Sequence, residues 1–343
     1  MFTGLAMRLF WLVLLFSYQG QTLAHSWPGF AKQQSCLELY PTYPQLVADI
    51  RRQTPWYSLD HWLAPWLLPE QQFENTQQQL DCAQLEYHSD NFLVQAWGLQ
   101  PKATQSKKWP VIIYNRGGNS ALGRLDFVSV LRQLSPLAQQ GFIVLASQYR
   151  GSVPQDQKTY GKDQFGGADV NDIHQLIELA KNLPGADADN VFLYGISRGG
   201  MMSYLTAQQR GDIRAMAITG APTDLVTELP RLPEMELIFR SLIPNYDQNK
   251  QQALQQRSVL YWAEELPANL PILLMYGGED QRVHPDNSKR LAAKLTELKR
   301  TVKLIEFTDA DHLLTDYKEQ EREAMLHWFR QHQYNSQKPV AAP

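Results

Sequence analysis

Short apolar runs alternate with longer amphipathic segments from about residue 110 to the end of the chain. Short apolar runs predict buried strands, and apolar residues at every third or fourth position predict helices. The predicted strands are Val111–Tyr114, Phe142–Ala146, Val191–Tyr194, Arg214–Thr219, Ile272–Tyr276 and Val302–Phe307. The predicted helices are Leu125–Gln140, Asp169–Leu183, Met201–Gln209, Asn287–Lys299 and Arg322–Gln333. This alternation indicates an α/β protein with a mostly parallel central sheet and helices on both faces.

Two further strands, Leu85–His88 and Phe92–Gly98, precede this alternating region. Asp90 and Asn91 lie between them and are typical of a tight turn, so an antiparallel hairpin is predicted. The sheet should therefore be mixed. The segment Leu225–Leu266 breaks the alternation and is interpreted as an insert, or cap region.

The N-terminus has the features of a secretory signal peptide. Arg8 precedes the apolar run Leu9–Phe16, and small residues lead up to Ala24. We expect cleavage after Ala24, with Met7 as an alternative start, and a periplasmic or secreted product. The apolar run is well short of the roughly 20 residues that span a bilayer, so an uncleaved anchor is the less favoured reading and no stable membrane insertion is expected after cleavage.

Residues 25–84 are interpreted as an N-terminal extension packed on a catalytic domain of residues 85–333, and residues 334–343 as a disordered tail. The extension is rich in Trp, Pro and Gln, and its second half looks helical. Its aromatic side chains either pack it onto the core or line a substrate entrance, and packing is the favoured interpretation.

Cys36 and Cys82 are the two cysteines of the chain. In a reducing compartment they would be two ordinary thiols, whereas an exported chain with an even pair favours one disulfide. We expect that disulfide, which would fasten the extension to the body.

The composition excludes several classes of function. The 343 residues are 43% hydrophobic and 20% charged, with a formal net charge of −3, which gives no electrostatic case for nucleic-acid binding. The sequence has no Cys/His cluster with zinc spacing and no phosphate-binding loop. No metal and no organic cofactor is expected.

The segment Gly195-Ile196-Ser197-Arg198-Gly199 lies between a predicted strand and a predicted helix. A Gly-x-Ser-x-Gly motif in that context predicts a tight turn that exposes a nucleophilic serine beside the N–H groups of a helix N-terminus. The alternative is a glycine-rich turn whose serine only caps the helix. We interpret Ser197 as the nucleophile.

Two other predicted strands are followed by an acid and a base. Asp280 follows Ile272–Tyr276, and His312 follows Val302–Phe307. Active groups gather at the carboxyl ends of strands in such sheets, so Ser197, Asp280 and His312 are expected to form a triad in which His312 takes the serine proton and Asp280 orients the imidazole. The rivals are Glu279 and Asp309 for the acid and His284 for the base.

Two backbone N–H groups are expected to bind the oxyanion. One belongs to Arg198, directly after the nucleophile, and the other to Gly117 in the loop Arg116-Gly117-Gly118 after the first parallel strand. A simple glycine turn is the alternative interpretation of that loop. Arg150 and Asp169 are expected to form a structural ion pair beneath the site.

These motifs together resemble the α/β-hydrolase superfamily and, more narrowly, the catalytic domain of the prolyl oligopeptidase family. The resemblance extends over about residues 85–333 and rests on the serine, acid and histidine motifs and on two further stretches, Tyr149-Arg150-Gly151-Ser152 and Phe165–Asp172. Family members typically carry His-Gly-Gly-Pro where this chain has Arg116-Gly117-Gly118-Asn119. They also carry a large N-terminal β-propeller, for which residues 25–84 are too few.

The resemblance implies the α/β-hydrolase fold and a serine hydrolase. We expect an exported enzyme that cleaves an ester or amide bond of a small-molecule or peptide substrate through an acyl-enzyme. A carboxylesterase acting on small acyl esters is the alternative, and a non-catalytic binding protein on a hydrolase scaffold is a further one.

Overall fold

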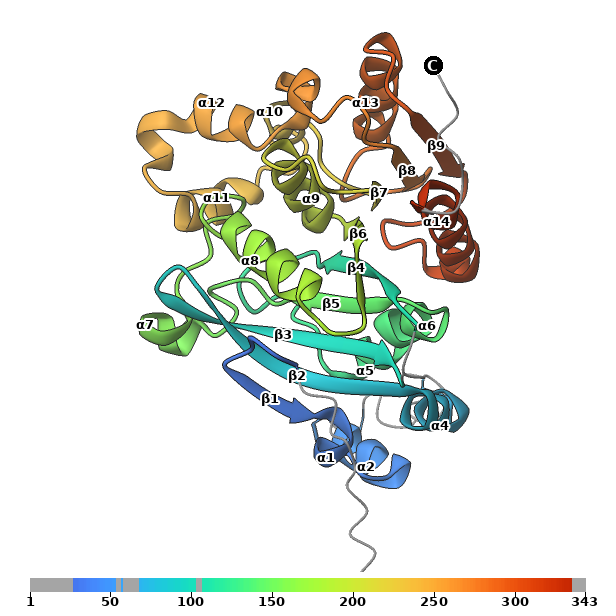
Figure 1. The fold of residues 1–343 in the computed structure, drawn as a ribbon. Helices are drawn as coiled ribbons and strands as arrows, with labels where there is room; N and C mark the ends of the chain where they lie inside the picture. The colour runs from blue at the N-terminus through green and yellow to red at the C-terminus, as the bar shows by residue number, and fades with distance from the viewer. Residues whose placement is uncertain (1–26, 54–56, 58–67, 103–106, 335–343) are drawn as a thin grey trace, which may run out of the picture.

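Nine strands in the described residues form one mixed sheet (Figure 1). The computed structural model describes residues 27–53, 57, 68–102 and 107–334. Neighbouring strands follow the order β1-β2-β3-β5-β4-β6-β7-β8-β9. The strands are β1 Lys32–Ser35, β2 Leu80–Ser89, β3 Phe92–Pro101, β4 Trp109–Asn115, β5 Ile143–Ser147, β6 Ala186–Ile196, β7 Ala215–Thr219, β8 Ile272–Gly277 and β9 Val302–Phe307.

Helices occupy most of the connections between these strands. The α-helices are α1 Cys36–Leu39, α2 Tyr43–Gln53, α4 Glu70–Gln79, α5 Phe127–Ser129, α6 Ser135–Gln139, α7 Gln157–Tyr160, α8 Val170–Lys181, α9 Arg198–Gln208, α10 Leu225–Glu228, α11 Met235–Leu242, α12 Tyr246–Gln256, α13 Asp286–Glu297 and α14 Lys318–His332. The short helices are η1 Val130–Leu134 (a π-helix), η2 Pro154–Asp156, η3 Val259–Tyr261, η4 Ala263–Glu265 and η5 Thr315–Tyr317. The predicted helix at Leu125–Gln140 is thus α5, η1 and α6 in succession.

The sheet has the predicted mixed direction. β1, β2, β3 and β5 pair antiparallel in that order, and every pairing from β5 through β4 to β9 is parallel. In the β2–β3 hairpin Ser89 lies opposite Phe92, so Asp90 and Asn91 form the two-residue turn. Asp90 takes a φ of +49°, a value that Asp adopts more readily than most residues.

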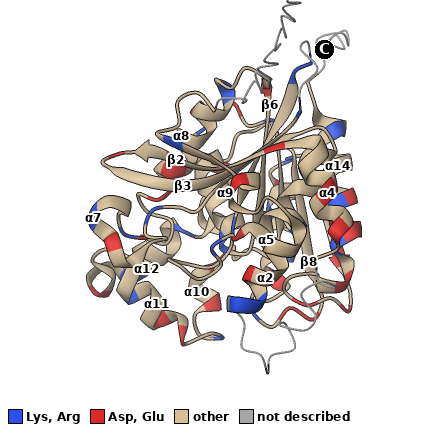
Figure 2. Ribbon diagram, turned by 90° about the horizontal axis from the view of Figure 1, so that it is seen from below, with Lys and Arg blue, Asp and Glu red and all other residues tan. Residues whose placement is uncertain are grey.

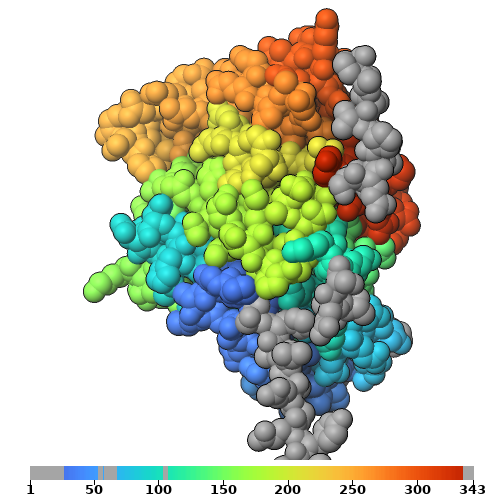
Figure 3. All heavy atoms as spheres, viewed as in Figure 1, coloured from blue at the N-terminus to red at the C-terminus, as the bar shows by residue number. Residues whose placement is uncertain are grey.

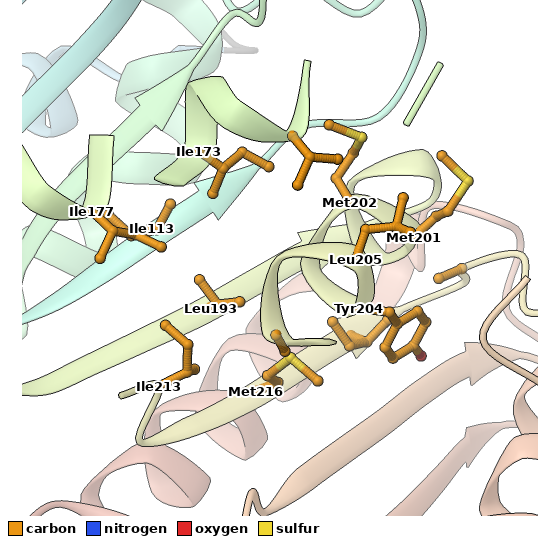
Figure 4. Close-up of a cluster of buried hydrophobic side chains, with 14 of the residues drawn as sticks. Ile113, Ile173, Ile177, Leu193, Met201, Met202, Tyr204, Leu205, Ile213 and Met216 are labelled. Carbon is orange, nitrogen blue, oxygen red and sulfur yellow. The ribbon is translucent and has the colours of Figure 1, made fainter. Parts of the chain in front are cut away.

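Successive side chains of each central strand enter two different cores, as the pleat requires. Val111 and Ile113 of β4 pack with residues of α8, α9 and α13, together with the insert. Ile112 and Tyr114 of the same strand pack on the opposite face with residues of α4, η1, α6 and α14. Figure 4 shows part of the first core, in which Ile113 of β4 lies beside Ile177 of α8, and α9 contributes Met202 and Leu205. The continuous apolar runs in the sequence reflect this burial on both faces.

The insert between β7 and β8 is helical and contains α10, α11 and α12. Its middle part projects from the body (Figure 3, light orange). Phe239 of α11 contacts Phe165 in the loop before α8, with ring centroids 5.1 Å apart. The insert therefore packs against a loop at the carboxyl edge of the sheet.

The N-terminal segment is joined to the sheet in two ways. β1 pairs with β2, and a disulfide joins Cys36 at the start of α1 to Cys82 in β2. The predicted disulfide is thereby confirmed. The predicted signal peptide, the tryptophans at 56, 62 and 66, and residues 335–343 lie outside the described residues.

Charged residues of both signs are interspersed along the helices around the sheet (Figure 2). Within the part of the chain that is described, no helix is both long enough and apolar enough to cross a membrane.

Candidate active site

Ser197 occupies the turn between β6 and α9. Its backbone has φ +55° and ψ −128°, a conformation that residues with a side chain rarely adopt. Such strained residues persist only where the surrounding structure holds them, and they cluster at functional sites. The N–H of Ser197 donates to the carbonyl oxygen of Thr219 across 2.8 Å. The turn therefore has the geometry expected of a nucleophile elbow.

The glycines of the motif allow this close approach. A Cβ atom at Gly199 would overlap the carbonyl oxygen of Asn115 at the end of β4. A Cβ atom at Gly195 would overlap the carbonyl oxygen of Gly199. The spacing of the motif thus follows from the packing of β4, β6 and α9 against one another.

Asp280 and His312 form a hydrogen-bonded pair. The His312 Nδ1 atom lies 2.7 Å from the Asp280 Oδ2 atom, and their side chains are 10% and 0% exposed. The other carboxylate oxygen of Asp280 accepts the N–H groups of Arg282 and Val283 at 2.8 and 2.9 Å. Because Asp280 engages Nδ1, the Nε2 atom of His312 is left for exchange of a proton.

Two glycines allow the acid and base loops to cross. Gly278 donates to Phe307 at 2.8 Å, and Glu279 donates to Ala310 at 3.0 Å. A Cβ atom at Gly277 or Gly278 would overlap carbonyl oxygens of the loop that carries His312. The Gly-Gly turn after β8 is therefore a packing requirement of the acid–base pair.

Gly220 packs against the acid–base pair. A Cβ atom at this position would lie 3.3 Å from Asp280 Oδ2 and 3.4 Å from His312 Nδ1, and its φ is +54°. The residue before it, Thr219, is the one that accepts the Ser197 N–H. The three predicted residues are thus brought to one edge of the sheet. Among the described residues no hydrogen bond joins Ser197 Oγ to His312, and such bonds commonly tighten only when substrate is present.

The rival acid and base residues are arranged differently. His284 is 41% exposed, and its Nδ1 atom accepts the N–H of Asp286. Asp309 accepts a hydrogen bond from the hydroxyl of Tyr317. Glu279 is exposed, and its backbone N–H donates to Ala310. The carboxylate that meets the imidazole of His312 is that of Asp280.

The predicted oxyanion loop lies against the serine. A Cβ atom at Gly117 would be 3.2 Å from the Cβ atom of Ser197. The buried guanidinium of Arg116 holds this loop by five hydrogen bonds to four carbonyl oxygens, those of Gly117, Ser120, Leu122 and Gln148. Burial lowers the pKa of Arg116 to about 10, so it stays cationic at neutral pH. Arg116 therefore organises the loop through backbone oxygens alone.

The ion pairs beneath the site differ from the prediction. Arg150 does not pair with Asp169; it pairs with Asp172 at 2.7 Å and with Asp90 at 2.7 Å. The reason is that Asp169 precedes α8 and accepts the N–H groups of Gly166 and Gly167, whereas Asp172 lies in the first turn and faces Arg150. The expected Arg150–Asp169 pair is therefore wrong.

Asp169 instead pairs with Arg198, whose side chain joins three loops. Its guanidinium also binds both oxygens of Asp163, at 2.6 and 2.8 Å, and the carbonyl oxygen of Gly118 at 3.1 Å. Asp163 in turn accepts the N–H of Ser120 at 2.6 Å. Burial alone would raise the pKa of Asp163, but the charge and hydrogen bonds of Arg198 outweigh it and hold that pKa below its usual value.

A third buried arginine links this cluster to the insert. Arg257, which directly follows α12, donates to the carbonyl oxygens of Phe165, Gln164 and Ala253. Burial lowers the pKa of Arg257. Arg116, Arg198 and Arg257 thus face two carboxylates, Asp163 and Asp169, which leaves a surplus of positive charge beside the predicted oxyanion loop.

Sequence reasoning missed three contributors to this site: Asp163, Gly220 and the partnership of Arg198 with Asp169. Gly220 follows a strand, as the predicted active residues do, and that position was an available signal. Asp163 lies in a loop without periodicity, so no sequence pattern distinguished it from other acids.

The fold and the site together define a serine hydrolase with the α/β-hydrolase fold. The chain belongs to the prolyl oligopeptidase family, because residues 128–336 match the sequence profile of that family. It is accordingly a hydrolase of the serine peptidase type.

Curated relatives are similar over different shares of their length. The uncharacterized peptidase YtmA of Bacillus subtilis (strain 168) is 25% identical over 247 residues, which are 72% of this chain and 91% of the relative. Dipeptidyl peptidase 8 of Homo sapiens is 30% identical over 193 residues, which are 54% of this chain and 20% of the relative. The chain thus spans about a fifth of the length of that dipeptidyl peptidase.

Solved structures share the fold. Acylaminoacyl peptidase of Pyrococcus horikoshii aligns with a TM-score of 0.60 at 19% identity, over 76% of this chain and 44% of that one. An acetyl xylan esterase from Paenibacillus sp. R4 aligns with a TM-score of 0.57 at 16% identity, over 84% and 92% of the two chains. Since both identities are low, these alignments establish the fold and leave the substrate open.

Proposed function

We propose that this protein is an exported serine hydrolase that cleaves an amide or ester bond in a peptide-like substrate through an acyl-enzyme, with Ser197, His312 and Asp280 as its triad. One observation carries the proposal. The Asp280–His312 pair, joined at 2.7 Å, packs against the glycine that follows the acceptor of the Ser197 N–H. Each of the three residues follows the carboxyl end of its own parallel strand, β6, β8 or β9.

In the acylation step Ser197 Oγ attacks the substrate carbonyl carbon while its proton passes to His312 Nε2. Asp280 keeps the imidazole in the required tautomer and stabilises the imidazolium that forms. The tetrahedral intermediate then collapses: the bond from carbon to the leaving nitrogen or oxygen breaks, and the leaving group takes the proton from His312. An acyl-Ser197 ester and a free amine or alcohol result.

Deacylation repeats these steps with water. His312 removes a proton from water as the water oxygen attacks the acyl carbon. The bond from Ser197 Oγ to that carbon then breaks, and the proton returns to the serine oxygen. A carboxylic acid is released and the enzyme is restored without any cofactor.

The N–H groups of Arg198 and Gly117 are proposed to hold the oxyanion. Arg198 is the first residue of α9, where backbone N–H groups have no partner within the helix. Gly117 lies against Ser197. The next residue, Gly118, accepts a hydrogen bond from the side chain of Arg198 through its carbonyl oxygen. The positive charge of Arg116, Arg198 and Arg257 favours the development of negative charge at this point.

Substrate class is the part of the proposal that rests on the family. Relatives named acylamino-acid-releasing enzyme and dipeptidyl peptidase 8 support a substrate whose cleaved amide bond lies near the end of a peptide. The runner-up is a carboxylesterase of small acyl esters, and the third is a binding protein that performs no chemistry. Because amides and esters pass through the same acyl-enzyme, the site residues serve either substrate.

The decisive experiment compares Ser197→Ala with the wild-type chain. Ser197→Ala should abolish labelling by a fluorophosphonate and lower hydrolysis of p-nitrophenyl esters by about 10³-fold or more. Ser241→Ala, which removes a serine hydroxyl from α11, should leave both unchanged. Unchanged hydrolysis in Ser197→Ala would exclude the mechanism, and a folded wild-type chain that resists labelling would favour the binding protein. A panel of aminoacyl arylamides, N-acyl-aminoacyl arylamides and acyl esters then distinguishes peptidase from esterase by kcat/KM.

Export is supported by the Cys36–Cys82 disulfide, since disulfides persist in oxidising compartments. The proposal predicts that the full chain, expressed in a Gram-negative host, is recovered outside the cytoplasm with His25 as its first residue. Recovery from the cytoplasm with an intact N-terminus and two free thiols would contradict it.

A further inference from the structure

The mechanism above does not use one buried carboxylate that lies beneath the Ser197 elbow. Glu321 of α14 is 1% exposed. Its Oε1 atom accepts the hydroxyl of Tyr194 at 2.7 Å and that of Thr219 at 2.6 Å. Its Oε2 atom accepts Lys318 Nζ at 2.8 Å, and the side chain of Lys318 is 45% exposed. Both oxygens of Glu321 therefore have partners.

Two of these partners lie on the strands that meet at the serine. Tyr194 belongs to β6, three positions before Ser197, and Thr219 is the last residue of β7. The carbonyl oxygen of Thr219 accepts the Ser197 N–H at 2.8 Å. Glu321 thus fixes the side chain of the residue whose backbone anchors the serine.

The helix that carries Glu321 also follows the loop of His312. Leu314 is fully buried and donates its N–H to Asp311, and Tyr317 donates to Leu314, so the chain passes from His312 to α14 through hydrogen-bonded turns. A single carboxylate consequently joins the strand before the serine, the strand beside it and the helix after the histidine.

Physical chemistry gives this arrangement a consequence. The φ of +55° at Ser197 is strained, so it persists only while surrounding groups hold it. The bond to Thr219 is one such restraint, and Thr219 is oriented by a charge-assisted hydrogen bond to Glu321. Loss of the carboxylate would leave two buried hydroxyl groups without an acceptor and would release Thr219.

We propose that Glu321 is a positioning residue that, through Thr219, holds Ser197 in the position required for attack on the substrate carbonyl. This inference rests on the proposed role of Ser197 as the nucleophile.

The test measures two quantities that report on Ser197: the second-order rate of labelling by a fluorophosphonate, and kcat and KM for a p-nitrophenyl ester. In Glu321→Ala the labelling rate and kcat should fall about 10- to 100-fold while KM stays within about twofold, because the reacting atom is misplaced and the binding surface is not altered. Glu321→Gln should restore both rates to near the wild-type values. Its amide oxygen accepts the same two hydroxyl groups, and Lys318 turns to solvent.

A matched pair of threonines separates positioning from a general loss of packing. Thr219→Val removes the hydroxyl that binds Glu321, and Thr76→Val removes an equally buried hydroxyl from α4. Thr219→Val should slow labelling about tenfold, whereas Thr76→Val should not. This pair decides the question if Glu321→Ala fails to fold.

Folded Glu321→Ala that labels at the wild-type rate would overturn the inference, and so would equal slowing in the two threonine variants. Continued labelling of Ser197→Ala would instead refute the proposed function itself, so the two failures are distinguishable.

Discussion

The guanidinium of Arg198 donates a hydrogen bond to the carbonyl oxygen of Gly118 across 3.1 Å. Arg198 is one proposed oxyanion donor and Gly118 follows the other, Gly117, while Asp163 and Asp169 bind the same guanidinium. The side chain of Arg198 therefore sets the distance between the two donor N–H groups, those of Arg198 itself and of Gly117. Oxyanion stabilisation depends on where the donors point, so this contact has a kinetic consequence.

Arg198→Lys should lower kcat about 10- to 100-fold with the fold preserved. A lysine keeps the charge, but its single ammonium group cannot bind both oxygens of Asp163 and also reach Asp169 and Gly118. The measurement is kcat for an activated ester, with thermal unfolding recorded in parallel.

Arg210→Lys is the matched control for that substitution. Arg210 pairs with Glu178 and Asp212 near the surface, and such pairs contribute only about 0–1 kcal/mol. The kcat of Arg210→Lys should equal that of the wild type. If Arg198→Lys behaves like Arg210→Lys in both kcat and stability, the guanidinium does not position the donors.

Gly220→Ala should lower activity because its methyl group would press on the acid–base pair. The Cβ atom would lie 3.3 Å from Asp280 Oδ2, and the φ of +54° is itself unfavourable for alanine. We expect kcat to fall about tenfold or more, since small displacements of reacting groups have large effects on rate. Gly211→Ala is the control, because a Cβ atom there has no neighbour within 4 Å. Equal kcat values for the two variants would show that Gly220 tolerates a side chain.

Asp163 should make stability depend on pH in the acid range. Its pKa in the folded chain lies below the ordinary value of 3.8, so the unfolded chain binds more protons and stability falls as pH drops through this range. At pH 7 Asp163→Asn should lose about 3 kcal/mol of unfolding free energy, because Arg198 loses a buried partner. The difference between the two chains should shrink below about pH 4, which denaturant titrations from pH 7 to pH 3 would show. A difference that stays constant over this range would contradict the assignment.

Replacement of both Cys36 and Cys82 by serine should lower the unfolding free energy by about 2–4 kcal/mol, since the disulfide closes a loop between positions 46 residues apart. Hydrolysis at 25 °C should be unchanged, because the disulfide joins α1 to β2, whereas the proposed triad residues follow β6, β8 and β9. A reductant should lower the unfolding temperature of the wild type and leave the double variant unaffected. Equal unfolding temperatures with and without reductant would show that the bond does not stabilise the fold.

The parallel strands were predictable because burial on both faces leaves continuous apolar runs in the sequence. Ser197, Asp280 and His312 were recognisable for the related reason that each follows such a run. β1 was not predicted, since its sequence Lys32–Ser35 is polar and it lies at an exposed edge of the sheet. α14 begins at Lys318, before the predicted start at Arg322. A short 3-10 helix leads into α14, so the sequence carries no capping signal at its start.

The ion pairs were beyond prediction for a different reason. Asp169 and Asp172 are one helical turn apart, so the sequence does not tell which of them faces Arg150. The answer depends on the direction in which α8 crosses the sheet. Glu321 is likewise one acid among several in a charged helix, and its burial is visible only once α14 is packed.

The order of strands has a consequence for the making of the protein. β6, which Ser197 follows, lies inside the sheet, whereas β8 and β9, which Asp280 and His312 follow, come last among the strands of the described residues. A growing chain that ends before Val302 lacks His312, the proposed base. If the proposed triad is correct, hydrolytic activity should therefore arise only after β9 and the His312 loop have been synthesised and have packed against the rest of the sheet.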